Sequence, residues 1–393
     1  MTGRLPVLMK FGGSAFVELD GYARVARYAV ERLTREGRPL VIVVSAMSGT
    51  TTRLRQFLDA LSDEPPADAS AMLLTTGETV SVALLATALA SRGVFVRPLS
   101  APDIGLVADR VSDRARLRRA EPAPLRAALH DDGCQAVVVP GGQAAEAGGR
   151  TVMLGRNSSD LSVVALAGAL GVDHCEIYSD VPGVCTADPY VVPNAQVLDR
   201  IGYQGLRLMS WYGAKVVHDS AIDWAERTGV RLRCLPFPWE NDTGTGTLVD
   251  PDGPTAPAVI VHGSGDVWRF HDTGERRRAT QALRGQDLRT TPVDTHGGTY
   301  LVVPHEGGDQ LRSLTSARLC EDLRLVTVLT ESGDPRFTLV RRPDAESEAQ
   351  HQHDLLYPPG QQARTAIRAK SRSPHSAALI GGPDGRGLLG EVT

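Results

Sequence analysis

The sequence is poor in the residues that mark several common classes of protein. Its only cysteines are Cys134, Cys175, Cys185, Cys234 and Cys320, far apart and without a CxxC spacing, so neither a zinc site nor a disulfide framework is expected. Aromatic residues make up 5% of the chain, which disfavours base-stacking platforms. No apolar run approaches the roughly 20 residues of a membrane-spanning helix, and no secretory signal opens the sequence. We therefore expect a cytoplasmic protein without a metal centre of its own.

Neither sign of charge is in excess. The 42 Lys+Arg and 46 Asp+Glu give a net charge of -4, without the basic surplus that is typical of nucleic-acid binding. The hydrophobic fraction of 42% and the charged fraction of 22% are those of a folded protein with a sizeable core. The length of 393 residues suits two or three domains. We expect a small-molecule ligand, with no nucleic acid and no membrane as partner.

Strand-like and helix-like segments alternate over the first 250 residues. Short runs rich in Val, Ile and Leu predict buried strands, and apolar residues at three- to four-residue intervals predict helices. The predicted strands are 5–9, 40–45, 136–139, 175–178 and 230–235, and the predicted helices are 22–36, 70–90, 162–170 and 221–227. This alternation indicates an α/β fold with a central, mostly parallel sheet between helices. Ligands bind such sheets at the carboxyl ends of the strands.

The remainder of the chain has weaker patterns. Strands are predicted at 259–262 and 300–303, and helices at 280–283 and 310–314. Residues 341–374 are rich in Gln, His, Ser and Pro, which favours a polar loop. We expect residues 1–250 to form the main domain and residues 251–393 a smaller α+β region.

A lysine and two glycines follow the first predicted strand, in the segment Lys10–Ser14. Glycines at this place let backbone N–H groups face an anion, and the lysine adds positive charge. The segment is not a Walker A loop, since no GxxxxGK[ST] pattern occurs. Taken alone, it fits an anion site and a simple strand-ending turn equally well.

An ordered set of further motifs accompanies this segment. They are SAMSGTTTRL (45–54), TGE (76–78), VVPGG (138–142), LGRNSSD (154–160), CEIYSDVPGV (175–184), TADP (186–189) and GAKVVH (213–218). In residues, order and spacing the set resembles the aspartate kinase branch of the amino acid kinase family, over about residues 5–250. The resemblance implies the amino acid kinase fold and transfer of the γ-phosphoryl group of ATP, bound as its Mg²⁺ complex, to the side-chain carboxylate of L-aspartate. It also implies a homodimer or higher homo-oligomer.

The resemblance further implies roles for individual residues. Lys10, Lys215 and Asp160 would be catalytic, the lysines by neutralising the transferring phosphoryl group and Asp160 by orienting them or a water on Mg²⁺. Nucleotide binding is implied for Lys10, Phe11, Gly12, Gly13, Ser179, Asp180, Cys185, Tyr190, Lys215 and Val216, and substrate binding for Thr51, Glu78, Arg156, Asn157, Ser158 and Ser159. Arg156 suits an α-carboxylate, and Glu78 and Thr51 match positions that hold an α-ammonium. No general base is required, because the acceptor carboxylate is ionised at pH 7.

Several positions depart from the family pattern. Gly142 stands where an aromatic residue is usual, Asn157 and Ser158 replace two glycines, and Cys185 and Tyr190 replace a tyrosine and an arginine. Three interpretations are open: an ordinary aspartate kinase, a kinase retuned to another amino acid or carboxylate in a specialised pathway, and a non-catalytic paralogue that binds nucleotide or amino acid. The resemblance also predicts that the C-terminal region is ACT-like or degenerate, with a regulatory or dimerisation role.

Overall fold

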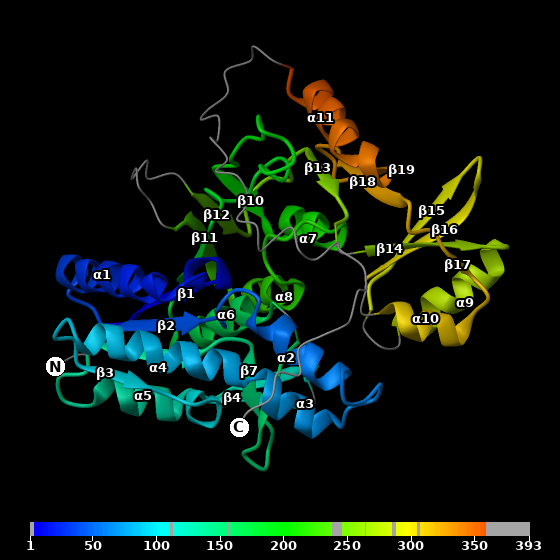
Figure 1. Ribbon diagram of the computed structural model, residues 1–393. Coiled ribbons are helices and arrows are strands. Elements are labelled where there is room, and N and C mark those ends of the chain that lie inside the picture. The colour runs from blue at the N-terminus through cyan, green and yellow to red at the C-terminus, as the bar shows by residue number, and fades with distance from the viewer. Residues whose placement is uncertain are drawn as a thin grey trace, which may run out of the picture.

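The structure is a computed structural model that describes residues 4–110, 113–155, 157–237, 246–263, 265–284, 288–304 and 307–358. The chain forms a larger region up to about residue 250 and a smaller C-terminal region beyond it. Figure 1 shows the larger region at lower left, in blue to green, and the C-terminal region at upper right, in yellow and orange.

An eight-stranded sheet forms the centre of the larger region, in the order β10–β12–β11–β9–β1–β2–β6–β3. The strands from β11 to β3 run parallel, and β12 is antiparallel to β11. Their bounds are β1 (Val7–Phe11), β2 (Leu40–Val44), β3 (Val96–Pro98), β6 (Ala136–Pro140), β9 (His174–Ser179), β10 (Arg200–Gly202), β11 (Arg231–Pro236) and β12 (Thr247–Asp250). The predicted mostly parallel sheet is therefore confirmed.

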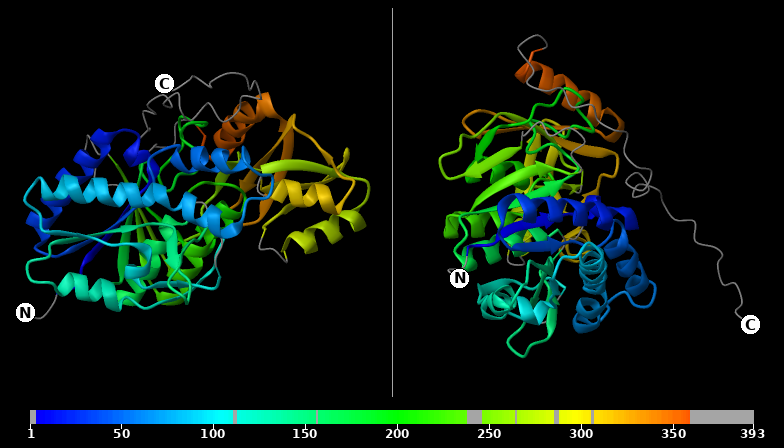
Figure 2. Two further views of the ribbon diagram at one scale, coloured as in Figure 1. Left: turned by 60° about the horizontal axis from the view of Figure 1, so that its bottom comes forward. Right: turned by 90° about the vertical axis from the view of Figure 1, so that its left-hand side faces the viewer.

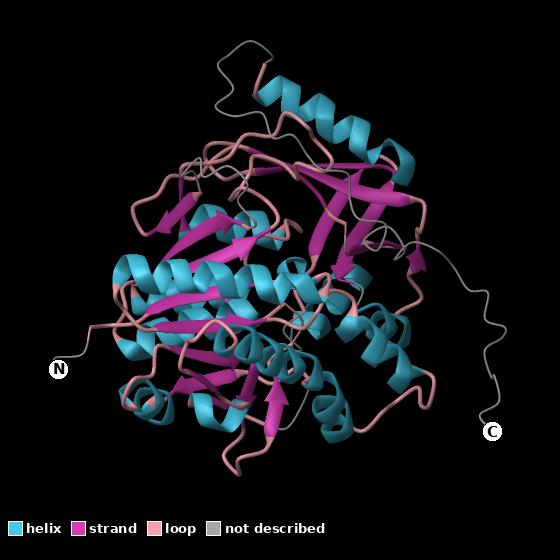
Figure 3. Ribbon diagram, turned by 60° about the vertical axis from the view of Figure 1, so that its left-hand side comes forward, coloured by secondary structure: helices cyan, strands magenta, loops and turns pink. Residues whose placement is uncertain are grey.

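Helices cover both faces of this sheet (Figure 3). The helices of the larger region are α1 (Leu19–Glu36), α2 (Thr50–Asp59), α3 (Ala67–Leu74), α4 (Thr76–Ala90), α5 (Ala123–His130), α6 (Ser159–Leu170), α7 (Tyr203–Trp211) and α8 (Asp219–Thr228), with 3-10 turns η1 (Gly13–Phe16) and η2 (Ala101–Ile104). Alternate residues of β2 face opposite sides of the sheet, because successive side chains of a strand point to opposite sides. Ile42 packs in one core cluster with α1 and α4, and Val43 packs in the other with α5, α6 and α8. Burial on both faces explains why the strands read as continuous apolar runs.

A small side sheet sits beside the carboxyl end of β6. Its order is β5–β4–β7–β8, formed by β4 (Leu106–Ala108), β5 (Leu117–Ala120), β7 (Gln143–Ala145) and β8 (Thr151–Met153). Because β7 begins only three residues after β6 ends, the turn between them holds Gly141 and Gly142 at the edge of the central sheet.

The C-terminal region consists of two α+β units, one inserted in the other. The inserted unit has β14 (Gly265–Phe270), α9 (Thr273–Arg284), β15 (Thr291–Thr295), β16 (Gly298–Pro304), α10 (Gly308–Leu314) and β17 (Arg318–Leu319). The outer unit is the antiparallel sheet β13–β18–β19 with α11, where β13 is Ala258–Val261, β18 is Leu323–Leu329, β19 is Pro335–Arg341 and α11 is Ala345–Leu356. Figure 2 shows this region at one end of the molecule. The predicted smaller α+β region is confirmed.

The polar loop predicted at 341–374 is wrong for its described part. Arg341 ends β19, the short 3-10 turn η4 (Arg342–Asp344) follows, and α11 begins at Ala345. Residues 359–374 lie outside the described residues. The helix forms because Ala345, Ala349 and His353, spaced four residues apart, are all buried and share one face.

One helical stretch has the length and composition of a membrane span. It runs over 24 residues, Ala67–Ala90, across α3 and α4, with mean hydropathy 1.5. Half of its apolar window is buried inside the protein, and core helices of soluble proteins pass the same test. Since Val82, Leu85 and Leu89 of α4 pack against the central sheet, we interpret the stretch as a core helix.

Candidate active site

The first cluster of predicted residues joins β1 to α6. Lys10, near the end of β1, forms an ion pair with Asp160 in the first turn of α6, with 2.7 Å between Nζ and Oδ1. The two side chains are 13% and 7% exposed. The second carboxylate oxygen of Asp160 accepts a hydrogen bond from the backbone N–H of His218 at 3.3 Å. The carboxylate therefore holds a nearly buried ammonium group in one position at the carboxyl edge of the sheet.

Glycines leave space directly beside this ammonium. A Cβ at Gly12 would lie 3.4 Å from Lys10 Nζ, and a Cβ at Gly13 would lie 3.2 Å from the carbonyl oxygen of Ala46. Phe11, between the lysine and the glycines, points to the other side, where its ring stacks on Tyr178 in the core with centroids 4.7 Å apart. The Phe11 side chain belongs to the core, and the nucleotide contact predicted for Phe11 stays a prediction.

Glu78 is a buried carboxylate in the first turn of α4. One oxygen accepts a hydrogen bond from the Ala46 backbone N–H at 3.3 Å, and the other accepts one from the Gln143 amide at 3.1 Å. Burial raises the pKa of Glu78 from 4.5 to about 7, and the hydrogen bonds only partly offset it. Among the described residues, no cation forms an ion pair with this carboxylate. It is suited to receive the cationic group of a ligand.

The start of α6 brings further predicted residues to the same place. The Ser159 hydroxyl is 2.9 Å from that of Ser45, which follows β2, and a Cβ at Gly141 would lie 2.6 Å from Ser159 Oγ. Asn157 has φ of 60°, a left-handed conformation that asparagine tolerates better than most residues. The replacement of glycine by Asn157 therefore preserves the backbone conformation. Arg156 lies outside the described residues.

Two of the departures from the family pattern contact each other. Gly142 has φ of 70°, and a Cβ there would lie 2.8 Å from Ser158 Oγ. The Ser158 hydroxyl is buried and donates a hydrogen bond to the Gly155 carbonyl at 2.6 Å. The Ser158 side chain thus occupies the space next to residue 142. A side chain at position 158 therefore goes together with the absence of one at position 142.

The predicted nucleotide-binding residues lie on loops. Ser179 ends β9, Asp180 follows it, and the Tyr190 hydroxyl donates to the Asp180 carboxylate at 3.1 Å. Lys215 and Val216 lie between α7 and α8, and Lys215 is exposed. The structure links this loop to the Lys10–Asp160 pair through the His218 N–H, rather than through Lys215. The predicted substrate residue Thr51 is half-buried near the start of α2.

Cys185 lies in an apolar cluster shared with the C-terminal region. Its neighbours in this cluster include Val192 from the larger region and Val259 and Val328 from β13 and β18. Burial raises the pKa of the thiol to about 12. The thiol is packed in this core, and the nucleotide contact predicted for Cys185 stays a prediction.

Three residues of the site were not predicted from the sequence. Gln143, which is buried, donates to Glu78 and to the Thr75 carbonyl, Ser45 contacts Ser159, and Gly141 leaves room for Ser159. A signal existed for Gln143: it is a polar residue placed directly after two glycines at the end of a buried strand.

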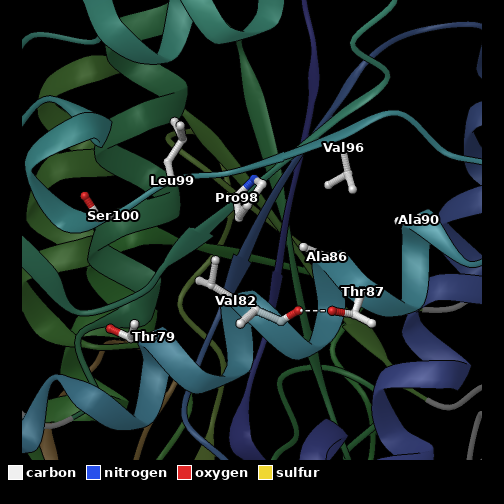
Figure 4. Close-up of a pocket in the computed structure, with 10 residues that line it drawn as sticks. Thr79, Val82, Ala86, Thr87, Ala90, Val96, Pro98, Leu99 and Ser100 are labelled. Atoms are coloured by element: carbon white, nitrogen blue, oxygen red, sulfur yellow. Dashed lines mark hydrogen bonds between the residues drawn. The ribbon is translucent and has the colours of Figure 1, made fainter.

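The structure contains two pockets, of which one is lined in part by predicted site residues and the other is not. The first pocket, of about 1190 Å³, lies between the β4–β5 hairpin, α8 and the C-terminal region, and Gly155, Asn157 and His218 are among the residues that line it. The other, of about 570 Å³, lies between α4 and β3 and is lined mainly by small and apolar side chains (Figure 4). None of the predicted site residues lines this second pocket. The parts of the chain that the structure describes hold no group of three or more His, Cys, Asp and Glu able to bind a metal.

The fold and the site together define a class of protein. It is an α/β protein whose parallel sheet presents a lysine–aspartate pair, a glycine edge and a buried, hydrogen-bonded carboxylate at the carboxyl ends of its strands. The model of the amino acid kinase family matches residues 6–235, more than half of the chain. The chain belongs to the amino acid kinase family.

Individual relatives carry more specific names. An aspartokinase of Pseudomonas aeruginosa is 34% identical over 257 residues, which cover 65% of this chain and 61% of the relative. An aspartokinase of Mycolicibacterium smegmatis is 39% identical over 227 residues, 58% of this chain and 53% of the relative. The chain thus spans little more than half the length of these relatives. The crystal structure of E. coli aspartokinase III with aspartate and ADP matches with a TM-score of 0.69 at 21% identity, over 90% of this chain and all of that one, which shows a shared fold.

Proposed function

We propose that the chain transfers the γ-phosphoryl group of ATP to the side-chain carboxylate of L-aspartate and forms 4-phospho-L-aspartate. The observation that carries this proposal is the Lys10–Asp160 pair beside Gly12, together with the unpaired Glu78 carboxylate on the neighbouring α4. The Lys10–Asp160 pair beside Gly12 suits a transferring phosphoryl group, and the Glu78 carboxylate suits the ammonium group of an amino acid. The names of the relatives support aspartate as the acceptor.

In this proposal, phosphoryl transfer depends on positioning and charge neutralisation. Lys10 and Lys215, two of only three lysines in the chain, neutralise the transferring group from opposite sides. Each lowers the barrier by about 3 kcal/mol, by analogy with other electrostatic stabilisers. Asp160 fixes the Lys10 ammonium, and the N–H groups of Gly12 and Gly13 face the phosphoryl oxygens. The attacking carboxylate needs no base, because it is already ionised.

The remaining predicted residues bind the two substrates. Glu78 and Thr51 hold the α-ammonium, Arg156 holds the α-carboxylate, and Ser159 adds a hydrogen bond, next to Asn157 and Ser158. Ser179, Asp180, Tyr190 and Val216 lie on the nucleotide side.

We further propose that the nucleotide enters as its Mg²⁺ complex. In such a complex the metal would be held mainly by phosphate oxygens and water, and Asp160 would orient the lysines or a water on the metal. When bound, Mg²⁺ neutralises phosphate charge. We also propose that the protein is cytoplasmic and forms a homodimer or higher homo-oligomer, with the C-terminal region supplying contacts between subunits.

The test is incubation of the full chain with MgATP, hydroxylamine and a panel of acids led by L-aspartate. Hydroxylamine traps an acyl phosphate as a hydroxamate, so equal amounts of ADP and hydroxamate are expected with aspartate. Absence of both, in a preparation that ATP and aspartate stabilise against heat, would identify a binding paralogue instead.

One observation favours a second candidate function. The coupled pair Gly142 and Ser158 alters the surroundings of the predicted substrate residues, as a kinase retuned to another amino acid requires. Hydroxamate from another acid of the panel, without hydroxamate from aspartate, would establish that function.

A further inference from the structure

One arginine of the C-terminal region contacts both ends of the loop that carries Lys215. Arg289 precedes β15, and its guanidinium lies over the ring of Trp211, 4.4 Å from the ring centroid. The same side chain pairs with Asp219, with 2.8 Å between Nε and Oδ2. Trp211 is the last residue of α7 and Asp219 is the first of α8. A single guanidinium therefore bridges the start and the end of loop 212–218.

Two further contacts from the C-terminal region reach the same loop. The ring of Tyr212 meets Phe337 of β19 edge to face, with centroids 5.4 Å apart. At Gly213, with φ of 101°, a Cβ would lie 2.7 Å from the ring of His262, which follows β13. Residues of both C-terminal units therefore contact the start of loop 212–218 or the residues that flank it.

The loop also touches the catalytic pair directly. His218, its last residue, donates its N–H to Asp160, which holds Lys10. A continuous path of contacts therefore runs from Arg289 through Asp219 and His218 to Asp160.

We propose that Arg289 is a positioning residue, which holds loop 212–218 so that Lys215 meets the phosphate groups of the nucleotide. The role of Lys215 in this statement rests on the proposed function, whereas the fixed position of the loop does not. An exposed lysine on a loop has many side-chain and backbone conformations, and fixing the loop reduces the entropy lost when it meets an anion.

The geometry separates this role from a contribution to stability. Solvent-exposed ion pairs contribute little to folding, and the Arg289 side chain is 49% exposed. The loss of Arg289 should therefore leave the melting temperature nearly unchanged while the loop becomes mobile.

The test compares the full chain with Arg289→Met and with Arg289→Lys, which keeps the charge but not the planar stacking group. Arg341→Met is the matched control, since Arg341 is an exposed arginine of the same region that pairs with Asp344 at 2.7 Å. The first readout is hydrogen exchange of the amides in 212–218, which does not depend on activity. The second is the KM for ATP against the KM for aspartate.

For Arg289→Met we expect faster exchange in 212–218 and a KM for ATP about tenfold higher, the size of one lost charged hydrogen bond, with the KM for aspartate within about twofold. Arg289→Lys should recover part of both effects, and Arg341→Met should show neither. Unchanged exchange overturns the proposal, and so does faster exchange with an unchanged KM for ATP. If the unmodified chain forms no hydroxamate, the proposed function fails, and ATP affinity from calorimetry replaces the KM in the same comparison.

Discussion

Lys10 and Asp160, which we propose to be catalytic, and Glu78 and Ser159, which we propose to bind the acceptor, are nearly or fully buried and lie in or next to strands and helices of the central core. We call these four residues the acceptor half of the site. Asp180, Tyr190 and Lys215, the nucleotide half, lie on loops, and two of them are exposed. The acceptor half is cross-linked by its own hydrogen bonds, such as Gln143 to Glu78 and Ser45 to Ser159. Other residues of the loops that carry the nucleotide half contact the C-terminal region.

The comparison of the two halves shows which region of the protein contacts each part of the site. The acceptor half lies in the core around the parallel sheet, and one hydrogen bond, from the His218 N–H to Asp160, reaches it from loop 212–218. The loops of the nucleotide half instead contact the outer C-terminal unit, where Thr186 meets His353 at 2.9 Å and where Tyr212 meets Phe337. Changes in the C-terminal region should therefore alter ATP binding more than acceptor binding.

The largest effect is expected from Lys10→Met in the acceptor half. Loss of the ammonium should reduce kcat by about 10²–10³, the cost of removing one electrostatic stabiliser. It also leaves the buried Asp160 carboxylate without its cationic partner, which costs about 3–5 kcal/mol of stability. The double variant Lys10→Met, Asp160→Asn should regain stability in urea unfolding without regaining turnover. Recovery of turnover in the double variant would show that Lys10 acts through folding alone.

Glu78 should make acceptor binding depend on pH. With a pKa of about 7, its carboxylate is charged above pH 7 and neutral below, so the KM for aspartate should rise as the pH falls from 8 to 6. Glu78→Gln should raise this KM about 10–100-fold, as for a lost charged hydrogen bond, and should remove the pH dependence. The KM for ATP, measured in parallel, should follow neither trend. An unchanged pH profile in Glu78→Gln would contradict this role.

Glu78 also makes the stability of the free protein depend on pH. The pKa of Glu78 is higher in the folded protein than in the unfolded chain. Its contribution to the free energy of unfolding is therefore present below pH 4.5 and is lost as the pH rises through 7. Bound aspartate should offset this loss, which thermal unfolding at several pH values would detect.

The Gly142–Ser158 contact should appear as energetic coupling within the acceptor half. Gly142→Ala should cost about 1–3 kcal/mol, because alanine strains a backbone with positive φ and contacts Ser158 Oγ. Ser158→Gly in the same chain should recover part of this cost, since the close contact disappears. Urea unfolding of both single variants and the double variant measures the coupling. Strictly additive effects would mean that the two positions are independent.

The smallest effect is expected in the nucleotide half. Tyr190→Phe removes one exposed hydrogen bond to Asp180 and should raise the KM for ATP by about two- to fivefold, with kcat unchanged. Tyr357→Phe, which loses a hydrogen bond to the Pro257 carbonyl, is a control outside the site. An equal change in both variants would indicate a general effect on packing.

Sequence reasoning predicted the acceptor half better than the nucleotide half, for a physical reason. Lys10, Glu78 and Asp160 lie at the ends of regular elements, where strand and helix patterns determine which residues meet. Cys185 and Arg289 instead obtain their surroundings from distant segments with weak patterns. The core position of Cys185 requires β13 and β18, and these strands cannot be paired from their residues alone.

The missed helix α11 shows a related difficulty. Its composition is polar, and only Ala345, Ala349 and His353 mark the buried face. Small side chains and a histidine carry little hydrophobic signal, so a sequence window reads the segment as a loop. The domain boundary near residue 250 and the roles of the individual site residues, Arg156 and Lys215 among them, remain predictions.

The most direct test of the account is ³¹P NMR of the full chain mixed with MgATP and L-aspartate. The account predicts that the γ-phosphate signal declines while an acyl phosphate signal grows, and that hydroxylamine removes the new signal. Lys10→Met should show neither change. Formation of inorganic phosphate alone without hydroxylamine, or no change in a mixture whose components bind, would contradict carboxylate phosphorylation by this chain.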